Sequence, residues 1–100
     1  MLTSKQRAAL RAQANSLDPV FQLGKGEIDE AVEQAVADCL AARELIKLKV
    51  LDTSPYTARE AASLLAEATG AEVVQVIGSK LVLFLQKAKE SRFAELLAGR

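Results

Sequence analysis

The segment EVVQVIGSKLVLFL occupies residues 72–85, and two runs rich in valine, isoleucine and leucine make up most of it. Such runs are typical of β-strands. Gly78 and Ser79 separate them, and a two-residue loop with glycine at its first position favours a tight type II′ hairpin. The segment therefore predicts two antiparallel strands, over residues 72–77 and 80–85.

Two further strands are expected upstream of this hairpin. Residues 20–23, VFQL, form a short run that is typical of a buried strand and ends at a glycine. Residues 45–51, LIKLKVL, have side chains that alternate between two faces of a strand. The pattern assigns one face to Ile46, Leu48 and Val50, and the other to Leu45, Lys47, Lys49 and Leu51.

Three segments have helical spacing. Thr3 with Gln6, and Thr57 with Glu60, have the spacing of capping boxes. They predict helices to about Ser16 and about Thr69, and Gly70 is placed to end the second. A middle helix is expected over residues 28–43. The inward-facing residues are expected to be Ala8, Leu10, Ala14 and Leu17 in the first helix, Ile28, Val32, Ala35, Val36, Cys39 and Leu40 in the middle one, and Ala61, Leu64, Leu65 and Ala68 in the last.

The predicted order of elements is αβαβαββ. Helical crossovers between the first three strands imply parallel or mixed pairing with right-handed connections. A chain of 100 residues, half of them apolar, has the size and composition of one domain with a core of its own. We therefore expect a single α/β domain with a four-stranded mixed sheet.

Charge is unevenly distributed along a chain whose formal net charge is zero. Residues 27–38 hold five acids and no base, so the thirteen bases of the remaining chain face only eight acids. A basic face is therefore compatible with neutrality. The polar start lacks the apolar stretch of a signal peptide, and no run approaches the length of a membrane span. These features predict a soluble, cytoplasmic protein without membrane contact.

Enzymatic chemistry finds little support in the composition. The chain has no histidine and one cysteine, Cys39. The absence of histidine rules out Ser/His/Asp and Cys/His arrangements, and a zinc site would need more ligands. Cys39 lies on the apolar side of the middle helix, so we expect it to be buried and inert. The sequence predicts no catalytic residue, no metal, no cofactor and no small-molecule substrate.

A glycine-rich turn follows the first predicted strand. Gly24 and Gly26 would let the backbone approach a phosphate, Lys25 adds a charge, and the next helix offers unpaired N–H groups. The alternative is a strand-to-helix turn in which the glycines only satisfy backbone geometry. Lys47 and Lys49 also have two interpretations, a solvated sheet face or a face that contacts phosphates. Further bases that could add to such a face are Arg43, Arg59, Lys80, Lys87 and Lys89.

Several of these segments, in this order and with these gaps, resemble the YhbY-like proteins, whose module is also called the CRM domain. They are LTSKQR (2–7), LDPV (17–20), LGKG (23–26), ARELIKLKV (42–50) and TGAEVVQVIG (69–78). The resemblance covers residues 2–85. The charged tail, residues 86–100, lies outside it, and we expect only a short amphipathic helix there, near Phe93, Leu96 and Leu97.

The resemblance implies the αβαβαββ fold and a similarity to the C-terminal domain of translation initiation factor three. It also implies RNA binding through a GxxG loop, as in KH domains, and association with precursors of the large (50S) ribosomal subunit. This chain has Glu27 where the family has the last glycine of that loop. A carboxylate there is expected to repel phosphate unless its side chain turns away, for example to cap the next helix.

Together these observations predict a monomeric RNA-binding protein that binds ribosomal RNA in 50S precursors and assists their assembly. The alternative is a protein-interaction module without direct RNA contact, and salt-sensitive RNA retention separates the two. The residues expected to contact RNA are Gly24, Lys25, Gly26, Arg43, Lys47 and Lys49.

Overall fold

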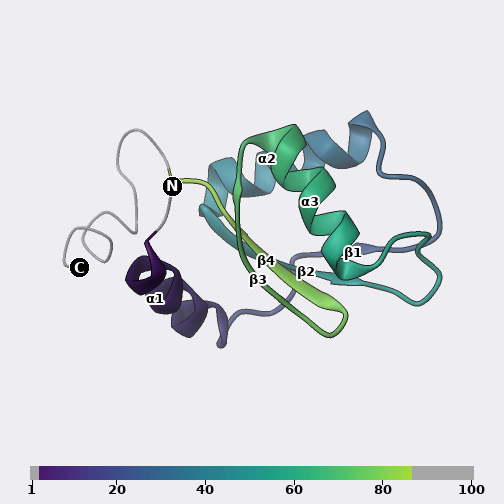
Figure 1. Ribbon diagram of the computed structural model, residues 1–100. Coiled ribbons are helices and arrows are strands. Elements are labelled where there is room, and N and C mark those ends of the chain that lie inside the picture. The colour runs from purple at the N-terminus through teal and green to yellow at the C-terminus, as the bar shows by residue number, and fades with distance from the viewer. Residues whose placement is uncertain (1–2, 87–100) are drawn as a thin grey trace.

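Four strands form one mixed sheet in the order β1-β2-β4-β3 (Figure 1). The computed structural model describes residues 3–86. Its elements are α1 (Ser4–Ala14), β1 (Phe21–Leu23), α2 (Glu30–Arg43), β2 (Leu45–Val50), α3 (Ala58–Thr69), β3 (Glu72–Ile77) and β4 (Lys80–Phe84). β1 and β2 are parallel, while β4 lies between β2 and β3 and is antiparallel to both. The predicted αβαβαββ order and mixed sheet are confirmed.

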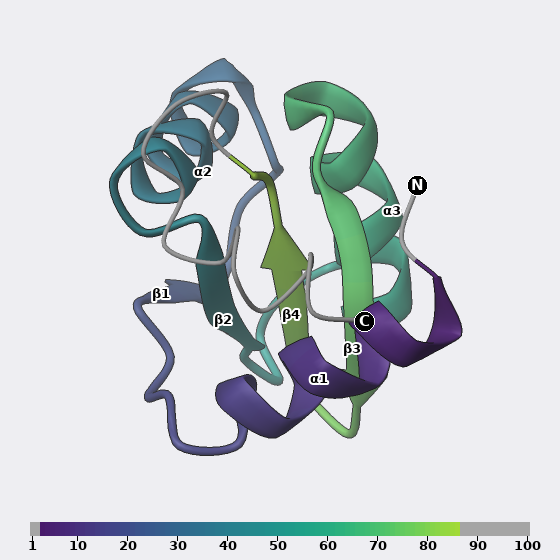
Figure 2. The same cartoon turned by 90° about the vertical axis from the view of Figure 1, so that its left-hand side faces the viewer.

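The sheet is covered by helices on both faces (Figures 1 and 2). α2 and α3 pack on the face that carries Ile46, Leu48 and Val50, and α1 packs on the opposite face over Leu45 and Phe84. The alternation predicted for residues 45–51 is therefore correct. The first residues of β2 are buried on both faces of the sheet, because a helix packs on each face there.

Local signals place most helix ends correctly. Both capping boxes are present, Thr3 with Gln6 and Thr57 with Glu60. Gly70 ends α3 with a φ of 80°, the left-handed conformation that glycine adopts without steric cost. Gly78 has a φ of 59°, as the first central residue of a type II′ turn requires.

The expected inward face of α3 is partly wrong. Leu65 and Ala61 are buried as predicted, but Leu64 is 40% exposed and Ala68 is exposed. The buried stripe runs instead through Ala58, Ala61, Ala62 and Leu65. α3 contacts β3, β4 and α2, and its alanine side allows a close approach to the sheet, which turns the bulkier Leu64 outward.

The α2 helix and the first strand also differ in detail from the prediction. α2 begins at Glu30 rather than Ile28, because Asp29 is its N-cap and accepts from the Val32 N–H at 3.0 Å. Gln22 of β1 is exposed rather than buried. Cys39 is only partly buried and packs against the edge of the core, so the prediction that it is buried was wrong.

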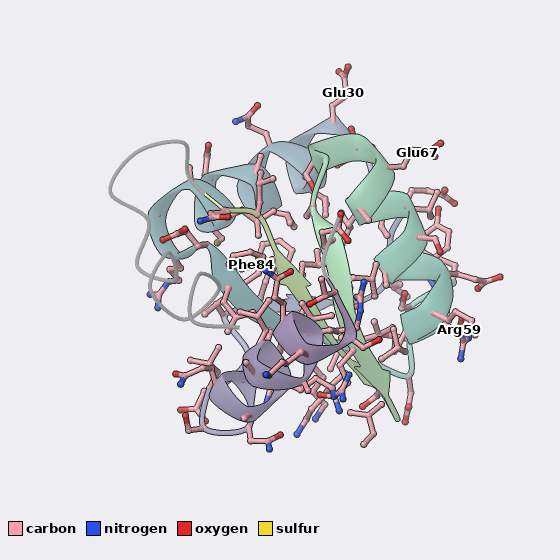
Figure 3. All side chains as sticks on the ribbon, turned by 60° about the vertical axis from the view of Figure 1, so that its left-hand side comes forward. Glu30, Arg59, Glu67 and Phe84 are labelled. Carbon is pink, nitrogen blue, oxygen red and sulfur yellow. The ribbon has the colours of Figure 1, made fainter. Side chains whose placement is uncertain are left out.

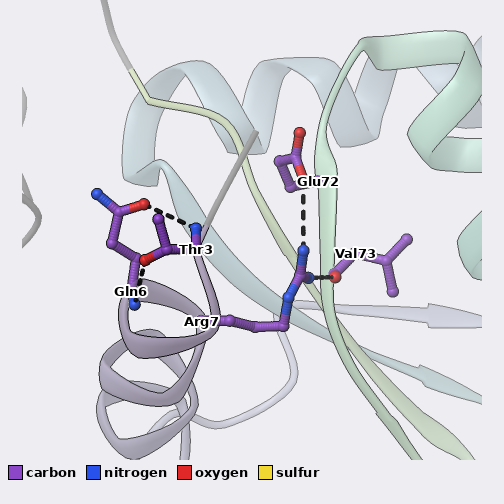
Figure 4. Close-up of polar contacts among 5 residues, drawn as sticks. All are labelled: Thr3, Gln6, Arg7, Glu72 and Val73. Carbon is purple, nitrogen blue, oxygen red and sulfur yellow. Dashed lines mark hydrogen bonds and ion pairs between the residues drawn. The ribbon is translucent and has the colours of Figure 1, made fainter.

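The α1 helix is held to β3 by a single arginine as well as by apolar packing. The Arg7 guanidinium donates to the carbonyl oxygen of Val73 and lies 3.7 Å from a carboxylate oxygen of Glu72 (Figure 4). A β-bulge between Val73 and Gln75 interrupts the register there. Val74 is buried against α1, while Val73 packs on the opposite side.

A tight junction joins α2 to β2. Glu44 is completely buried and has a φ of 67°, the only positive φ of a non-glycine residue within residues 3–86. Its N–H donates to the Leu40 carbonyl at 2.7 Å and its carbonyl accepts from the Leu85 N–H at 2.9 Å. These bonds hold a strained backbone conformation, so that β2 starts directly after the helix.

No helix in the described part of the chain is long and apolar enough to cross a membrane. The short helix expected near Phe93 lies outside the described residues.

Candidate nucleic-acid interface

Three connecting segments meet at one edge of the sheet, which we call the loop edge. β1, β2 and β3 run in the same direction, so their carboxyl ends share this edge. The three segments are the glycine loop (residues 24–26), the loop of residues 51–57, and the Gly78-Ser79 turn. Backbone hydrogen bonds join them to the strands: the Leu51 N–H donates to the Leu23 carbonyl at 2.8 Å and the Val50 N–H to the Ser79 carbonyl at 2.7 Å.

The two glycines of the glycine loop differ in what the fold demands of them. Gly26 has a φ of 138°, which a residue with a side chain adopts only under strain. Gly24 has no such backbone conformation. A methyl group at Gly24 would lie 3.5 Å from Leu51 Cδ1 and 3.7 Å from Thr53 Oγ1, ordinary contact distances. The fold therefore requires glycine at position 26 and tolerates a methyl group at position 24.

Glu27, the residue after the glycine loop, is hydrogen-bonded to a tyrosine. The Tyr56 hydroxyl donates to Glu27 Oε1 at 2.7 Å, which ties the glycine loop to the loop of residues 51–57. Asp29, and not Glu27, caps α2. The hydrogen bond to Glu27, with desolvation and the negative charge of Glu27, raises the pKa of Tyr56 above its ordinary value of 10.0.

The N-terminus of α2 is already occupied by acidic groups. Asp29 accepts the Val32 N–H, and Glu30 and Glu33 lie in the first turn. These carboxylates interact favourably with the positive end of the helix dipole. One of the N–H groups expected to be free there is therefore capped, and an anion at the glycine loop would meet the loop backbone, Lys25 and the acidic first turn of α2. A depression of about 190 Å³ lies at this place, lined by β1, the glycine loop, Glu27, Ile28, Val32 and Ser54.

Lys47 and Lys49 lie on the α1 face of the sheet, as the alternation predicts. Both are half-buried, and Lys49 is paired with Gln22 of β1, two residues before Gly24. Its partner on the other side is Lys80 of β4, which is exposed. Lys49 therefore lies close to the loop edge, and Lys47 lies one step further along the strand.

Arg43 is separated from the other predicted residues. It is the last residue of α2, exposed at the start of β2. β2 has six residues and spans roughly 17 Å at about 3.3 Å per residue, with the glycine loop beside its far end. Arg43 instead lines a separate pocket of about 440 Å³ with Gln13, Ser16 and Asp18. The structure thus brings together Gly24, Lys25, Gly26 and Lys49, with Lys47 next to them, but not Arg43.

Acidic side chains are concentrated on the two helices that cover one face of the sheet. Glu30 and Glu67 point outward from α2 and α3, and Arg59 is the base at the start of α3 (Figure 3). The other acids of these two helices are Glu33, Asp38 and Glu60. On the opposite side, the sheet carries Lys47, Lys49 and Lys80. These three lysines lie on the face of the sheet opposite α2 and α3, while Arg43 and Arg59 belong to those two helices.

Two residues of this edge were not predicted from the sequence. Tyr56 had no motif to mark it, and Lys80 was named only as a base that could not be placed. Loop packing brings Tyr56 to Glu27, which lies 29 residues earlier in the sequence. Strand register places Lys80 beside Lys49, which lies 31 residues earlier. Within residues 3–86, no group of three or more His, Cys, Asp or Glu side chains is arranged to hold a metal ion.

The chain is similar to several known proteins over nearly its whole length. The model of the CRS1/YhbY (CRM) domain family matches residues 2–84. The Probable RNA-binding protein YqeI of Bacillus subtilis is 38% identical over 96 residues, which are 96% of this chain and 99% of that protein. A Haemophilus influenzae protein named RNA-binding protein is 35% identical, covering 83% of this chain and 84% of its own length.

A solved structure has the same fold. The solution structure of the Staphylococcus aureus protein SAV1595, described as a candidate RNA-binding protein, superposes with a TM-score of 0.70. The two chains are 43% identical, and the match covers 92% of this chain and 98% of that one. With the family model matching residues 2–84 and these relatives matching nearly end to end, the chain belongs to the CRS1/YhbY (CRM) domain family.

Proposed function

We propose that this protein binds ribosomal RNA in precursors of the large (50S) ribosomal subunit and assists their assembly. Its relatives are named as RNA-binding proteins, and the resemblance to YhbY-like proteins supports a ribosomal target. It acts in the cytoplasm as a monomer, without a cofactor, a metal or a small-molecule substrate. It is not an enzyme, and the absence of histidine from the chain supports this.

One observation carries the proposal: the glycine loop with Lys25 follows β1 at the loop edge, Lys49 lies one position from the end of the neighbouring strand β2, and the Tyr56 hydroxyl donates a hydrogen bond to Glu27. Glycine at position 24 is not required by φ or by packing. A close approach of the RNA backbone to the loop supplies a reason for it, because a side chain there would stand between the loop and a phosphate. The carboxylate that would repel this phosphate is engaged by the Tyr56 hydroxyl.

The proposed contacts are mainly to phosphate and to RNA shape. Gly24, Lys25, Gly26, Lys47 and Lys49 contribute backbone approach and positive charge, and Arg43 contacts a separate part of the RNA from the opposite edge. The chain has four aromatic residues and no tryptophan, so base stacking contributes little. Binding that relies on phosphates weakens steeply with salt, because each neutralised phosphate releases counterions.

Gly24→Ala is the sharpest test of the loop, because the structure tolerates the methyl group. The variant should keep the parent's melting temperature and lose affinity for a large-subunit ribosomal RNA fragment in a gel-shift assay. Tyr56→Phe should also weaken binding, since it releases the Glu27 carboxylate. If Gly24→Ala had both the melting temperature and the RNA affinity of the parent, the glycine loop would not be part of the interface.

The ribosomal target is tested in cells. In a sucrose gradient of lysate, the parent should migrate with 50S precursors, and a high-salt wash should release it. A protein that stays at the top of the gradient, and that retains no ribosomal RNA at low salt, would contradict the proposal and favour the protein-interaction alternative.

A further inference from the structure

Part of the α1 face of the sheet is left open by α1. The helix buries Leu45, Val74, Val82 and Phe84, while the β3–β4 hairpin extends past it (Figure 2). In this open part the strand register aligns one residue from each strand. They are Gln22, Lys49, Lys80 and Ile77, paired in that order, and we call them the sheet row.

The two lysines of the sheet row face each other directly. Lys49 and Lys80 are partners in the antiparallel β2–β4 pair, where like charges opposite each other are destabilising. Within residues 3–86, the only ion pair joins Arg7 to Glu72, so no described carboxylate neutralises Lys49 or Lys80. Lys47 follows on the same face of β2. An anion bound between these ammonium groups would relieve their repulsion.

The other two members of the sheet row suit a nucleotide. Gln22 is exposed and offers an amide that both donates and accepts hydrogen bonds. Ile77 is 62% exposed, and its apolar side chain suits contact with the face of a base. A base in a duplex has its faces stacked on its neighbours, so such a contact is open only to an unpaired nucleotide.

We propose that the sheet row is a second contact site of the interface, at which Lys49 and Lys80 bind the phosphate backbone of a single-stranded RNA segment. This proposal rests on the proposed function and extends it. The row begins at Gln22, next to the glycine loop, and ends at the hairpin. Four strands about 4.8 Å apart give it a length of roughly 15 Å, so one continuous RNA strand reaches both sites.

The test compares Lys80→Gln with Arg59→Gln. Both variants remove one positive charge, but Arg59 lies on α3, in the helical layer (Figure 3). The probes are a fluorescent oligouridylate and an RNA duplex of equal length, with binding followed by polarisation at several salt concentrations. Lys80→Gln should weaken binding of the single strand several-fold and reduce its salt slope by up to about 0.7 units, with a smaller effect on the duplex. Arg59→Gln should bind like the parent.

A second measurement examines the free protein. Lys80→Gln should raise the melting temperature at low salt, because it removes the repulsion with Lys49, and added salt should shrink the difference. Three outcomes would contradict the proposal that the sheet row binds RNA. They are an equal loss of affinity in both variants, no loss of affinity in Lys80→Gln, and a lower melting temperature of Lys80→Gln than of the parent. If the parent binds the ribosomal RNA fragment but not oligouridylate, the sheet row alone fails. If it binds neither, the proposed function fails.

Discussion

Removing the charges of Lys47 and Lys49 is the most direct perturbation of the basic sheet face. Both side chains are half-buried, so their aliphatic stems contribute to packing as well as to charge. Glutamine keeps most of the stem and removes only the ammonium group. Neither lysine forms an ion pair with any residue among 3–86, and the double variant Lys47→Gln with Lys49→Gln also removes the repulsion between Lys49 and Lys80. It should therefore fold with a melting temperature equal to or above the parent's.

The size of the effect follows from counterion release. Each phosphate that the protein neutralises contributes about 0.7 units to the slope of log affinity against log salt for a single strand. If each lysine neutralises one phosphate, the double variant has a slope smaller by about 1.4 units. Over a fourfold rise in salt it then loses about sevenfold less affinity than the parent. At low salt it should bind more weakly, and about equally so across RNA sequences.

The assay is a filter or gel-shift titration of a large-subunit ribosomal RNA fragment at four or more salt concentrations, with Arg59→Gln as the control. That control removes a charge from α3 and should leave the slope unchanged. A double variant with the parent's affinity and slope would show that the basic face lies elsewhere. A control with an equally reduced slope would show that binding follows net charge and not the sheet face.

Other predictions follow from single contacts. Near-ultraviolet absorbance of Tyr56, the only tyrosine of the chain, should show a phenol pKa above 10.0 that Glu27→Gln lowers. Because only the protonated hydroxyl donates to Glu27, the contact stabilises the loop below pH 10.0 and is lost as pH rises through the raised pKa; a pKa unchanged in Glu27→Gln would contradict this. Leu65 is completely buried, so Leu65→Ala should cost about 2–5 kcal/mol in a denaturant melt. Gly70→Ala should cost about 1 kcal/mol, since alanine is strained at a φ of 80°, and an unchanged stability would refute that reason.

Helix ends and turns that are determined by residues close together in the sequence could be predicted. The capping boxes at Thr3 and Thr57 and the turn at Gly78 act over three or four residues, and each lies where the sequence predicts it. The inward face of α3 was not predictable in the same way. Apolar side chains are spread around this helix, so its periodicity does not decide between Leu64 and Ala58, and packing against the sheet does.

The candidate site shows the same division. The glycine loop is a local motif, and the sequence locates it correctly after β1. Arg43 is close to Lys49 in sequence, but it precedes β2, whereas Lys49 lies one position from the other end of that strand. Lys80 and Tyr56 reach the site only through strand register and loop packing. The burial of Glu44 depends on the junction between α2 and β2. No pattern of residues in the sequence predicts this junction.

The zero net charge of the chain is consistent with RNA binding, because salt screens the acids of α2 and α3 from the lysines of the sheet. Glu30 and Glu67 point outward from helices on the far side of the sheet (Figure 3), and a helix alone is about 10 Å wide. The Debye length is about 8 Å at physiological salt and about 30 Å at 0.01 M. The acids therefore oppose the lysines little at physiological salt and more strongly when salt is low. Glu30→Gln with Glu67→Gln should raise RNA affinity at low salt and leave it unchanged at physiological salt. An equal gain at both salt concentrations, measured in the same gel-shift titration, would mean that these carboxylates lie near the bound RNA.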